Sequence, residues 1–197
     1  MDWSMASDLH QADGRIAPDG RTGVVLYPVF KGSSERGDGM ESDVANTSST
    51  WRDHVIMWAK DASRAIDYAE TRPDLDHDKV AYYGISWGAI MGAIVPAVEP
   101  RIKVNVLALG GVDFHRSLPE VDTINFLPHV KQPTLMLNGH YDFFFPLEST
   151  QEPFYRLLGS KKDQKQHLLC EGGHSVPRNE LIKGTLNWLD QYLGPVQ

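Results

Sequence analysis

The sequence predicts an α/β protein, in which a mostly parallel sheet is covered by helices on both faces. Apolar runs of strand length alternate with helical segments from residue 24 onward, and parallel neighbours need such crossover segments between them. Hydrophobic residues make up 41% of the 197 residues, enough for the core of one domain. Three chemically reactive side chains follow predicted strands, where open α/β sheets carry their sites. We divide the chain into an irregular segment, residues 1–23, and one domain, residues 24–197.

Composition argues against several classes of partner. Lys plus Arg number 19 and Asp plus Glu number 26, so the net charge is −7, and an acidic chain is not drawn to nucleic acid or anionic lipid. The single cysteine, Cys170, excludes a disulfide framework and a multi-cysteine zinc site. The N-terminus lacks the features of a signal peptide, and the apolar runs reach about half of the roughly 20 residues that a membrane span needs. We therefore expect a cytoplasmic protein with no nucleic-acid or membrane partner, metal or cofactor.

Before residue 80 we predict one strand and one helix. Residues 24–30 form a continuous β-branched and aromatic run, which is typical of a buried strand. Residues 31–49 are rich in Gly, Ser and Asp and predict a long loop. A helix over 51–69, capped by Thr50, is predicted by apolar residues at helical spacing; they are Trp51, Val55, Trp58, Ala59, Ala62, Ile66 and Ala69.

After residue 80 the alternation is regular. Short apolar runs predict further strands over residues 80–83, 104–109, 134–137 and 166–170. Helices are predicted over 87–98 and over 148–158, which Pro153 begins or kinks, whereas prolines make 111–132 irregular. A final helix is capped by Asn179, with an apolar face of Ile182, Leu186, Leu189 and Leu193.

The segment Gly84-Ile85-Ser86-Trp87-Gly88 matches the pattern G-x-S-x-G. Composition alone gives such a match in roughly 6% of chains of this length, so its context carries the argument. A strand ends just before it and a helix of small residues begins at Trp87. A strand-to-helix turn of this kind is strained and lifts the serine side chain above the sheet edge. We infer that Ser86 is a nucleophile; the alternative is a glycine-rich turn with an idle serine.

A serine nucleophile needs a base, and the base needs an orienting acid. His174 follows the last predicted strand, and Asp142 follows the strand before it. The rival acid is Asp113, after the strand at 104–109, while His140 is too close in sequence to Asp142 and is expected at the rim. Alternatively, His174 is a loop residue satisfied by backbone, and Asp142 a turn residue or helix cap. Cys170 lies inside a strand and is expected to be a small buried side chain.

These segments resemble α/β-hydrolases of the dienelactone-hydrolase and prolyl-oligopeptidase-like branch, and still more the hydrolase regions joined to bacterial serine/threonine protein kinases. The similarity runs from about Gly23 to the C-terminus, and its motifs are V-L-Y-P-V-F-K-G, Y-G-I-S-W-G, L-M-L-N-G-H-Y-D-F-F-F-P-L and E-G-G-H-S-V-P-R. The resemblance implies a serine hydrolase acting on esters. Ser86 would be the nucleophile, His174 the base and Asp142 the orienting acid, with the Trp87 N–H as one oxyanion donor.

The chain departs from the family's pattern before residue 24, where three further strands and a glycine-rich oxyanion loop are expected. The resemblance therefore implies an α/β-hydrolase fold shortened at the N-terminus. Either another chain, such as a second copy in a homo-oligomer, completes the sheet, or the strand at 24–30 pairs directly with that at 80–83. In the second case Gly32 would lie near Ser86 and offer the second N–H.

The sequence thus predicts a carboxylic-ester hydrolase that acts through an acyl-enzyme on small, short-acyl esters, with Trp87 and Phe143 at the substrate. One alternative is a non-catalytic module that serves interaction, because the second oxyanion donor is not identified. Another is a peptidase or other acyl transferase, although the sequence holds no large substrate-selecting domain.

Overall fold

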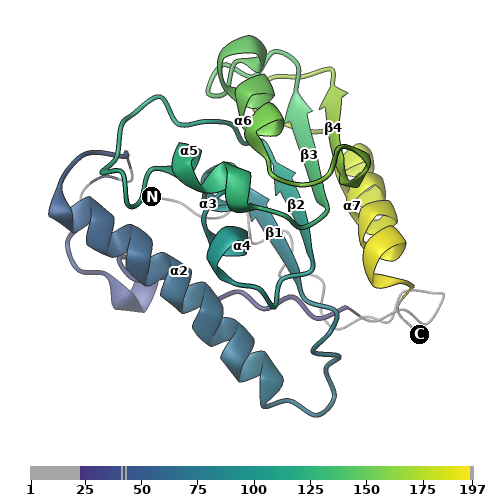
Figure 1. Cartoon of the computed structure of the whole chain (residues 1–197), viewed down its shortest axis with the longest axis horizontal. Coiled ribbons are helices and arrows are strands. Elements are labelled where there is room, and N and C mark those ends of the chain that lie inside the picture. Colours follow the sequence, from purple (N-terminus) through teal and green to yellow (C-terminus); the bar gives the residue numbers. More distant parts are fainter. Residues whose placement is uncertain (1–22, 41, 43, 196–197) are drawn as a thin grey trace.

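The computed structural model describes residues 23–40, 42 and 44–195, so the predicted segment 1–23 lies outside them except for Gly23. Four parallel strands in the order β1-β2-β3-β4 form its sheet (Figure 1). The strands are β1 Ala81–Ile85, β2 Val104–Ala108, β3 Thr134–Gly139 and β4 Lys165–Cys170. Each strand predicted after residue 80 is present, and all three neighbouring pairs are parallel, which confirms the predicted α/β class.

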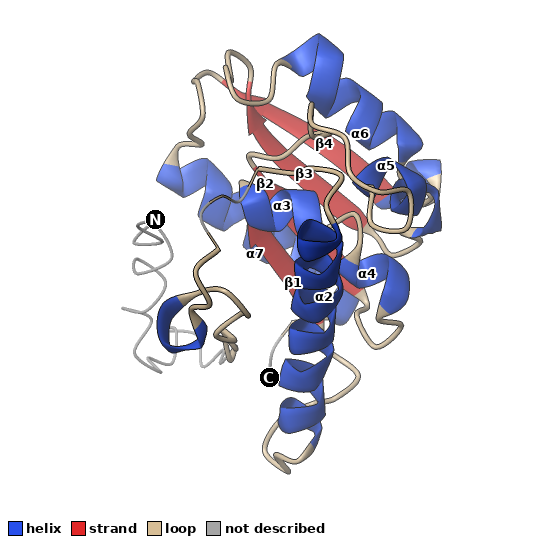
Figure 2. Cartoon of the chain, turned by 90° about the vertical axis from the view of Figure 1, so that its left-hand side faces the viewer, coloured by secondary structure: helices blue, strands red, loops and turns tan. Residues whose placement is uncertain are grey.

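Helices cover both faces of this sheet (Figure 2). On one face α7, Arg178–Leu193, buries Trp188 against β2 and β3. On the other face α3, Trp87–Met91, and α6, Glu152–Leu157, bury Ala89 and Phe154. Because both faces are covered, β2 and β3 are buried along their whole length, as their continuously apolar sequences indicate. The remaining helices are α2 Ser49–Glu70, α4 Val95–Val98 and α5 Thr123–Phe126.

The long helix α2 packs against the segment of α3 and α4. Its buried residues Trp51, Val55 and Trp58 belong to one apolar cluster with Met91 of α3. The helix begins at Ser49, and the Ser48 hydroxyl accepts a hydrogen bond from the Trp51 N–H at 3.1 Å. The cap is therefore Ser48, and the prediction of Thr50 is wrong by two residues.

The predicted strand over residues 24–30 is wrong. This segment has no regular secondary structure, and Val24 and Val25 are 69% and 64% exposed. In the described part of the chain, β1 pairs with β2 and its other edge is unpaired. A β-branched run becomes a strand only where a neighbour supplies ladder hydrogen bonds and packing, and among the described residues no strand pairs with this run.

Two predicted helices have different boundaries. The one over 87–98 is divided into α3 and α4, because Pro96 lies in the first turn of α4, where proline has no N–H to continue an earlier helix. The one over 148–158 is a π-helix, Leu147–Gln151, continued by α6 with Pro153 in its first turn. The segment 111–132, predicted irregular, contains α5.

The last helix differs from the prediction at its cap and its buried face. α7 begins directly after Pro177, so Asn179 is inside its first turn and is not the N-cap. Leu189 and Leu193 of the predicted face pack on the sheet side, but Ile182 and Leu186 are exposed, and Leu181 and Trp188 face the sheet in their place. The large apolar area of the indole decides which stripe of the helix faces the core.

Candidate active site

Ser86 is the single residue between β1 and α3. Its φ of 51° and ψ of −111° lie in a region that non-glycine residues rarely adopt. Three hydrogen bonds hold this conformation: the Ser86 N–H donates to the Ala108 carbonyl, and the Ser86 carbonyl accepts from Ala89 and Ile90. This is the strained strand-to-helix turn that the motif G-x-S-x-G predicts.

The residues around Ser86 show why the turn needs a glycine at its start. A Cβ on Gly84 would lie 2.3 Å from the Gly88 carbonyl oxygen, so only glycine fits there. Tyr82, in β1, donates its hydroxyl proton to the same oxygen at 2.6 Å. Burial raises the pKa of Tyr82, which keeps the phenol protonated as a donor. This role of Tyr82 was not predicted. Its only signal in the sequence is the presence of a tyrosine two residues before the motif.

The structure brings Ser86, His174 and Asp142 together. His174 Nε2 lies 2.9 Å from Ser86 Oγ, and His174 Nδ1 lies 2.8 Å from Asp142 Oδ2. The Asp142 side chain is fully buried, while that of His174 is 17% exposed. With Nδ1 donating to the carboxylate, Nε2 is left to accept the serine proton, which is the arrangement that activates a serine.

The loop that carries Asp142 is held by its own carboxylate. Asp142 Oδ1 accepts hydrogen bonds from the N–H groups of Phe144 and Phe145 at 2.9 and 3.0 Å. The Phe144 ring also lies edge-on to the His174 imidazole, with centroids 4.9 Å apart. Both carboxylate oxygens are therefore used, one for the loop and one for the histidine.

The loops after β3 and β4 touch at the backbone. The Tyr141 N–H donates to the Gly172 carbonyl at 2.8 Å, and a Cβ on Gly139 would lie only 1.8 Å from the Gly173 oxygen. Because no side chain fits between them, the acid and the histidine are carried by two loops in direct contact.

The other candidates from the sequence lie apart from this arrangement. The Asp113 carboxylate accepts hydrogen bonds from the backbone and ring of His115, whereas the carboxylate that bonds to His174 is that of Asp142. The His140 ring packs edge-on against Tyr141, at the rim. Cys170 lies in β4, where burial raises the pKa of its thiol, which disfavours the thiolate.

Gly32 does not offer a free N–H in this structure. Its N–H donates to the Arg36 carbonyl at 3.0 Å, and the Lys31 and Ser33 N–H groups are bonded to Asp61 and to the Phe30 carbonyl. The hypothesis that Gly32 supplies the second oxyanion donor required the 24–30 segment to pair with β1, and this pairing is absent among the described residues.

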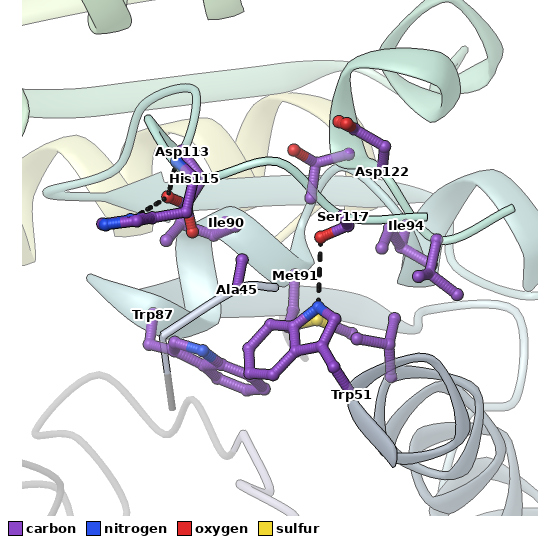
Figure 3. A pocket seen from close by; sticks show the side chains of 13 residues that line it. Ala45, Trp51, Trp87, Ile90, Met91, Ile94, Asp113, His115, Ser117 and Asp122 are labelled. Atoms are coloured by element: carbon purple, nitrogen blue, oxygen red, sulfur yellow. Dashed lines mark hydrogen bonds and ion pairs between the residues drawn. The ribbon is translucent and has the colours of Figure 1, made fainter. Parts of the chain in front are cut away.

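Trp87 lines a small pocket beside the nucleophile turn. Its ring packs edge-on against Trp58, with centroids 4.6 Å apart, and Trp58 donates to the Lys31 carbonyl. The cavity measures about 20 Å³, and Figure 3 shows Trp87 and Trp51 on one side of it and the Asp113–His115 pair on the other. Helical spacing predicts that Trp51 and Trp58 share one apolar face of the helix, but it gives no signal of their link to Trp87.

The described residues contain neither a candidate membrane-spanning helix nor a candidate metal-binding cluster. No helix within the described ranges is both long enough and apolar enough to cross a membrane. No group of three or more His, Cys, Asp and Glu side chains in the same ranges is arranged to hold a metal ion.

Comparison with known proteins gives several relatives, while no family model matches the chain. YtaP of Bacillus subtilis, which is named as a hydrolase, is 35% identical over 63 residues, covering 30% of this chain and 21% of that protein. A cold-adapted esterase from an Arctic intertidal metagenomic library is 32% identical with a TM-score of 0.59. That match covers 72% of this chain and 59% of the esterase, so this chain spans about a fifth of the first relative and under two thirds of the second.

More distant neighbours share the fold alone. A dienelactone-hydrolase-like protein of Klebsiella pneumoniae has a TM-score of 0.61 at 19% identity, over 70% of this chain and 62% of that one. Dipeptidyl peptidase 4 of Porphyromonas gingivalis has a TM-score of 0.59 at 11% identity, over 70% and 23%. Parallel sheet, helices on both faces and these neighbours together identify the fold of this chain as that of the α/β-hydrolases, with esterases and dienelactone-hydrolase-like proteins as its structural neighbours.

Proposed function

We propose that the protein is a serine carboxylic-ester hydrolase with Ser86, His174 and Asp142 as its catalytic triad. The observation that carries the proposal is the chain of two short contacts, Ser86 Oγ to His174 Nε2 at 2.9 Å and His174 Nδ1 to Asp142 Oδ2 at 2.8 Å. The esterase among the relatives supports hydrolysis of esters.

The reaction follows from these positions. Ser86 Oγ attacks the ester carbonyl carbon while Nε2 of His174 takes its proton, and Asp142 stabilises the imidazolium. The tetrahedral intermediate collapses, the C–O bond to the alcohol breaks, and His174 returns the proton to the leaving oxygen. A water molecule, deprotonated by His174, then attacks the acyl carbonyl carbon; the bond to Ser86 Oγ breaks, His174 returns the proton to Oγ, and the acid is released.

The negative oxygen of the intermediate needs hydrogen-bond donors. We assign one to the N–H of Trp87, the first residue of α3 and the residue after the nucleophile. The second donor is proposed to come with a strand added at the unpaired edge of β1, since the N–H groups of residues 31–33 are engaged elsewhere. One missing donor costs about 2.7–4 kcal/mol, or roughly 10²–10³ in turnover, so the triad alone would be slow.

Short acyl groups fit the pocket beside Trp87. Its volume of about 20 Å³ is that of one or two water-sized groups, which is about the size of an acetyl methyl. Phe143 is 71% exposed and packs on Phe144, which touches His174. Because His174 protonates the leaving alcohol, we place that part of the substrate against Phe143.

The test is covalent labelling combined with turnover. The purified protein is incubated with a fluorophosphonate, the adduct is located by mass spectrometry, and hydrolysis of a chromogenic acetate is measured beside Ser86→Ala. We expect the adduct on Ser86 and no turnover by the variant, whereas Ser49→Ala, an exposed serine at the start of α2, behaves as wild type. Full turnover by Ser86→Ala would refute the proposal.

Two other functions remain as outcomes of the same experiment. The engaged N–H groups of residues 31–33 favour a binding-only module, which would show neither adduct nor turnover. A peptidase would label at Ser86 and cleave a dipeptide amide faster than the matching ester.

A further inference from the structure

We propose that Gln151 is a positioning residue for the catalytic acid, an assignment that rests on the proposed function. Gln151 is fully buried and is the last residue of the π-helix Leu147–Gln151. Its Nε2 donates two hydrogen bonds, to the Gly139 carbonyl at 3.0 Å and to the Phe145 carbonyl at 2.7 Å. These two carbonyls stand at the two ends of the loop that carries Asp142, so one side chain joins both ends.

Asp142 closes the same loop from within. Its N–H donates to the Gly139 carbonyl at 3.3 Å, and its Oδ1 accepts from Phe144 and Phe145. Gly139 and Phe145 are thus fixed by Gln151 on one side and by Asp142 on the other. With Oδ1 committed to the loop, the direction of Oδ2 toward His174 depends on where Gly139 and Phe145 are held.

The chemistry of the carboxamide explains why glutamine fits this place. An NH₂ group is a neutral donor of two hydrogen bonds, and both are used here. The Gln151 Oε1, by contrast, is buried with no partner in the described structure. A buried unpaired oxygen is unfavourable, so the residue is held for its donors rather than for its acceptor.

The local backbone serves the same end. A π-helix is a rare and poorly bonded turn that is frequent at functional sites. Here the Thr150 and Gln151 N–H groups both reach the Pro146 carbonyl, at 3.0 and 3.5 Å. This wide turn places Gln151 in the core, next to the loop that carries Asp142.

Asn105 provides a matched control from the other end of the sheet. It is also fully buried, its Nδ2 donates to Thr134 Oγ1 at 3.1 Å, and its Oδ1 is unpaired. It lies at the start of β2, opposite Thr134 at the start of β3, whereas the catalytic side chains follow the strand ends. Replacing each amide by an apolar side chain of similar size removes buried hydrogen bonds in both cases. Only the replacement of Gln151 removes hydrogen bonds to the loop that carries Asp142.

The experiment compares Gln151→Met with Asn105→Leu, both measured at a temperature where circular dichroism shows them folded. We expect both to lower Tm, but only Gln151→Met to lower kcat for the chromogenic acetate, by roughly 10²-fold, as about 1 Å of misplacement does, with KM little changed. Gln151→Leu, which likewise has no donor and buries no charge, serves as a second variant should the methionine variant not fold. Unchanged kcat in the folded Gln151 variant, or equal losses of kcat in both variants, would overturn the proposal.

A second readout is independent of ester hydrolysis. The low-field proton resonance of the His174 Nδ1–H reports its hydrogen bond to Asp142, and is assigned by its loss in Asp142→Asn. We expect it to be retained in Asn105→Leu and to be lost or broadened in Gln151→Met. If the wild type hydrolyses no ester but the resonance is lost in Gln151→Met, the positioning role is supported and the proposed function is refuted. If the resonance persists in Gln151→Met, the positioning role is refuted.

Discussion

The two sides of the proposed catalytic arrangement are built very differently. On the side of β3 and β4, Asp142 is buried with both carboxylate oxygens bonded, and its loop lies directly against the backbone of the histidine loop. On the side of β1, the described part of the sheet ends, and the segment after Gly23 exposes Val24, Val25 and Leu26. The acid–base pair is thus complete within the described residues, whereas the surroundings of the oxyanion are not.

This difference separates two parts of catalysis. Activation of Ser86 requires only the histidine and the acid, which the packed side already holds. Stabilisation of the developing oxyanion requires donors aimed at one point, and beside the Trp87 N–H these depend on what adds to β1. If the proposed function holds, we therefore expect a reactive serine whose turnover is limited by the open side.

The largest effect is expected from the packed side. Asp142→Asn keeps the shape but offers an NH₂ or oxygen in place of the carboxylate, which leaves the imidazole in the wrong tautomer, and kcat should fall by roughly 10⁴-fold. Steady-state hydrolysis of a chromogenic acetate measures this. Asp113→Asn is the comparison, because Asp113 contacts His115 and not His174; a larger loss in that variant would transfer the role of acid to Asp113.

Glycine replacements test both sides with one added methyl group. Gly139→Ala brings a Cβ to 1.8 Å from the Gly173 oxygen, and Gly84→Ala brings one to 2.3 Å from the Gly88 oxygen. Each should lower the free energy of unfolding by at least about 2 kcal/mol, because backbone cannot move aside cheaply. Urea denaturation checks this against Gly88→Ala, where the added Cβ meets nothing within 4 Å. If Gly88→Ala lowered the free energy of unfolding equally, the close backbone contacts at Gly139 and Gly84 would not be the reason why alanine is excluded there.

The sequence alone predicts the packed side better than the open side. The runs at 104–109 and 134–137 are apolar throughout, and such runs become strands when both faces are covered, as they are in β2 and β3. Ser86, Asp142 and His174 were placed at one sheet edge because parallel strands end on the same side. The same reasoning failed at residues 24–30, since the pattern of a buried strand carries no information on whether its neighbour is present.

Other failures have local causes. Gln151 lies in a π-helix, and no periodicity in L-E-S-T-Q signals a five-residue turn. The face of α7 was predicted correctly at Leu189 and Leu193 but not at Ile182 and Leu186, because Trp188 turns a neighbouring stripe toward the sheet. Gly32 was proposed as a donor from its place in a loop, while the partner of its N–H, the Arg36 carbonyl, is visible only in the folded chain.

The open side yields a prediction about assembly. We propose that a second copy of the chain covers the β1 edge and the exposed residues Val24, Val25 and Leu26, since an unpaired edge beside apolar side chains favours association. Val25→Lys should then weaken self-association about tenfold or more, as loss of an interface anchor does. Sedimentation equilibrium measures this, with Leu169→Lys, an exposed residue of β4, as the control at the other edge. A wild type that stays monomeric at every concentration would contradict the proposal.

The smallest expected effects are on the pH dependence of the free energy of unfolding, which should differ between the two sides. His167, in β4, stacks on Tyr155, and burial lowers its pKa to about 4 from 6.5. The unfolded chain therefore takes up a proton at a higher pH than the folded chain, so the free energy of unfolding falls as the pH drops from above 6.5 toward 4. Because the side chain is partly exposed, we expect a loss on the order of 1–2 kcal/mol, which His167→Phe should remove from urea denaturation curves.

The open side should respond only in stronger acid. The hydrogen bond from Lys31, with one from His54, holds the pKa of Asp38 at about 2 instead of 3.8. Its carboxylate is favoured in the folded chain, so its contribution persists above pH 3.8 and is lost as the pH falls through about 2. Asp38→Asn should thus flatten the stability curve only at this acid end, whereas His167→Phe acts above pH 4. These assignments would be contradicted if Asp38→Asn changed the free energy of unfolding in the range assigned to His167, above pH 4, or if His167→Phe changed it in the acid range assigned to Asp38.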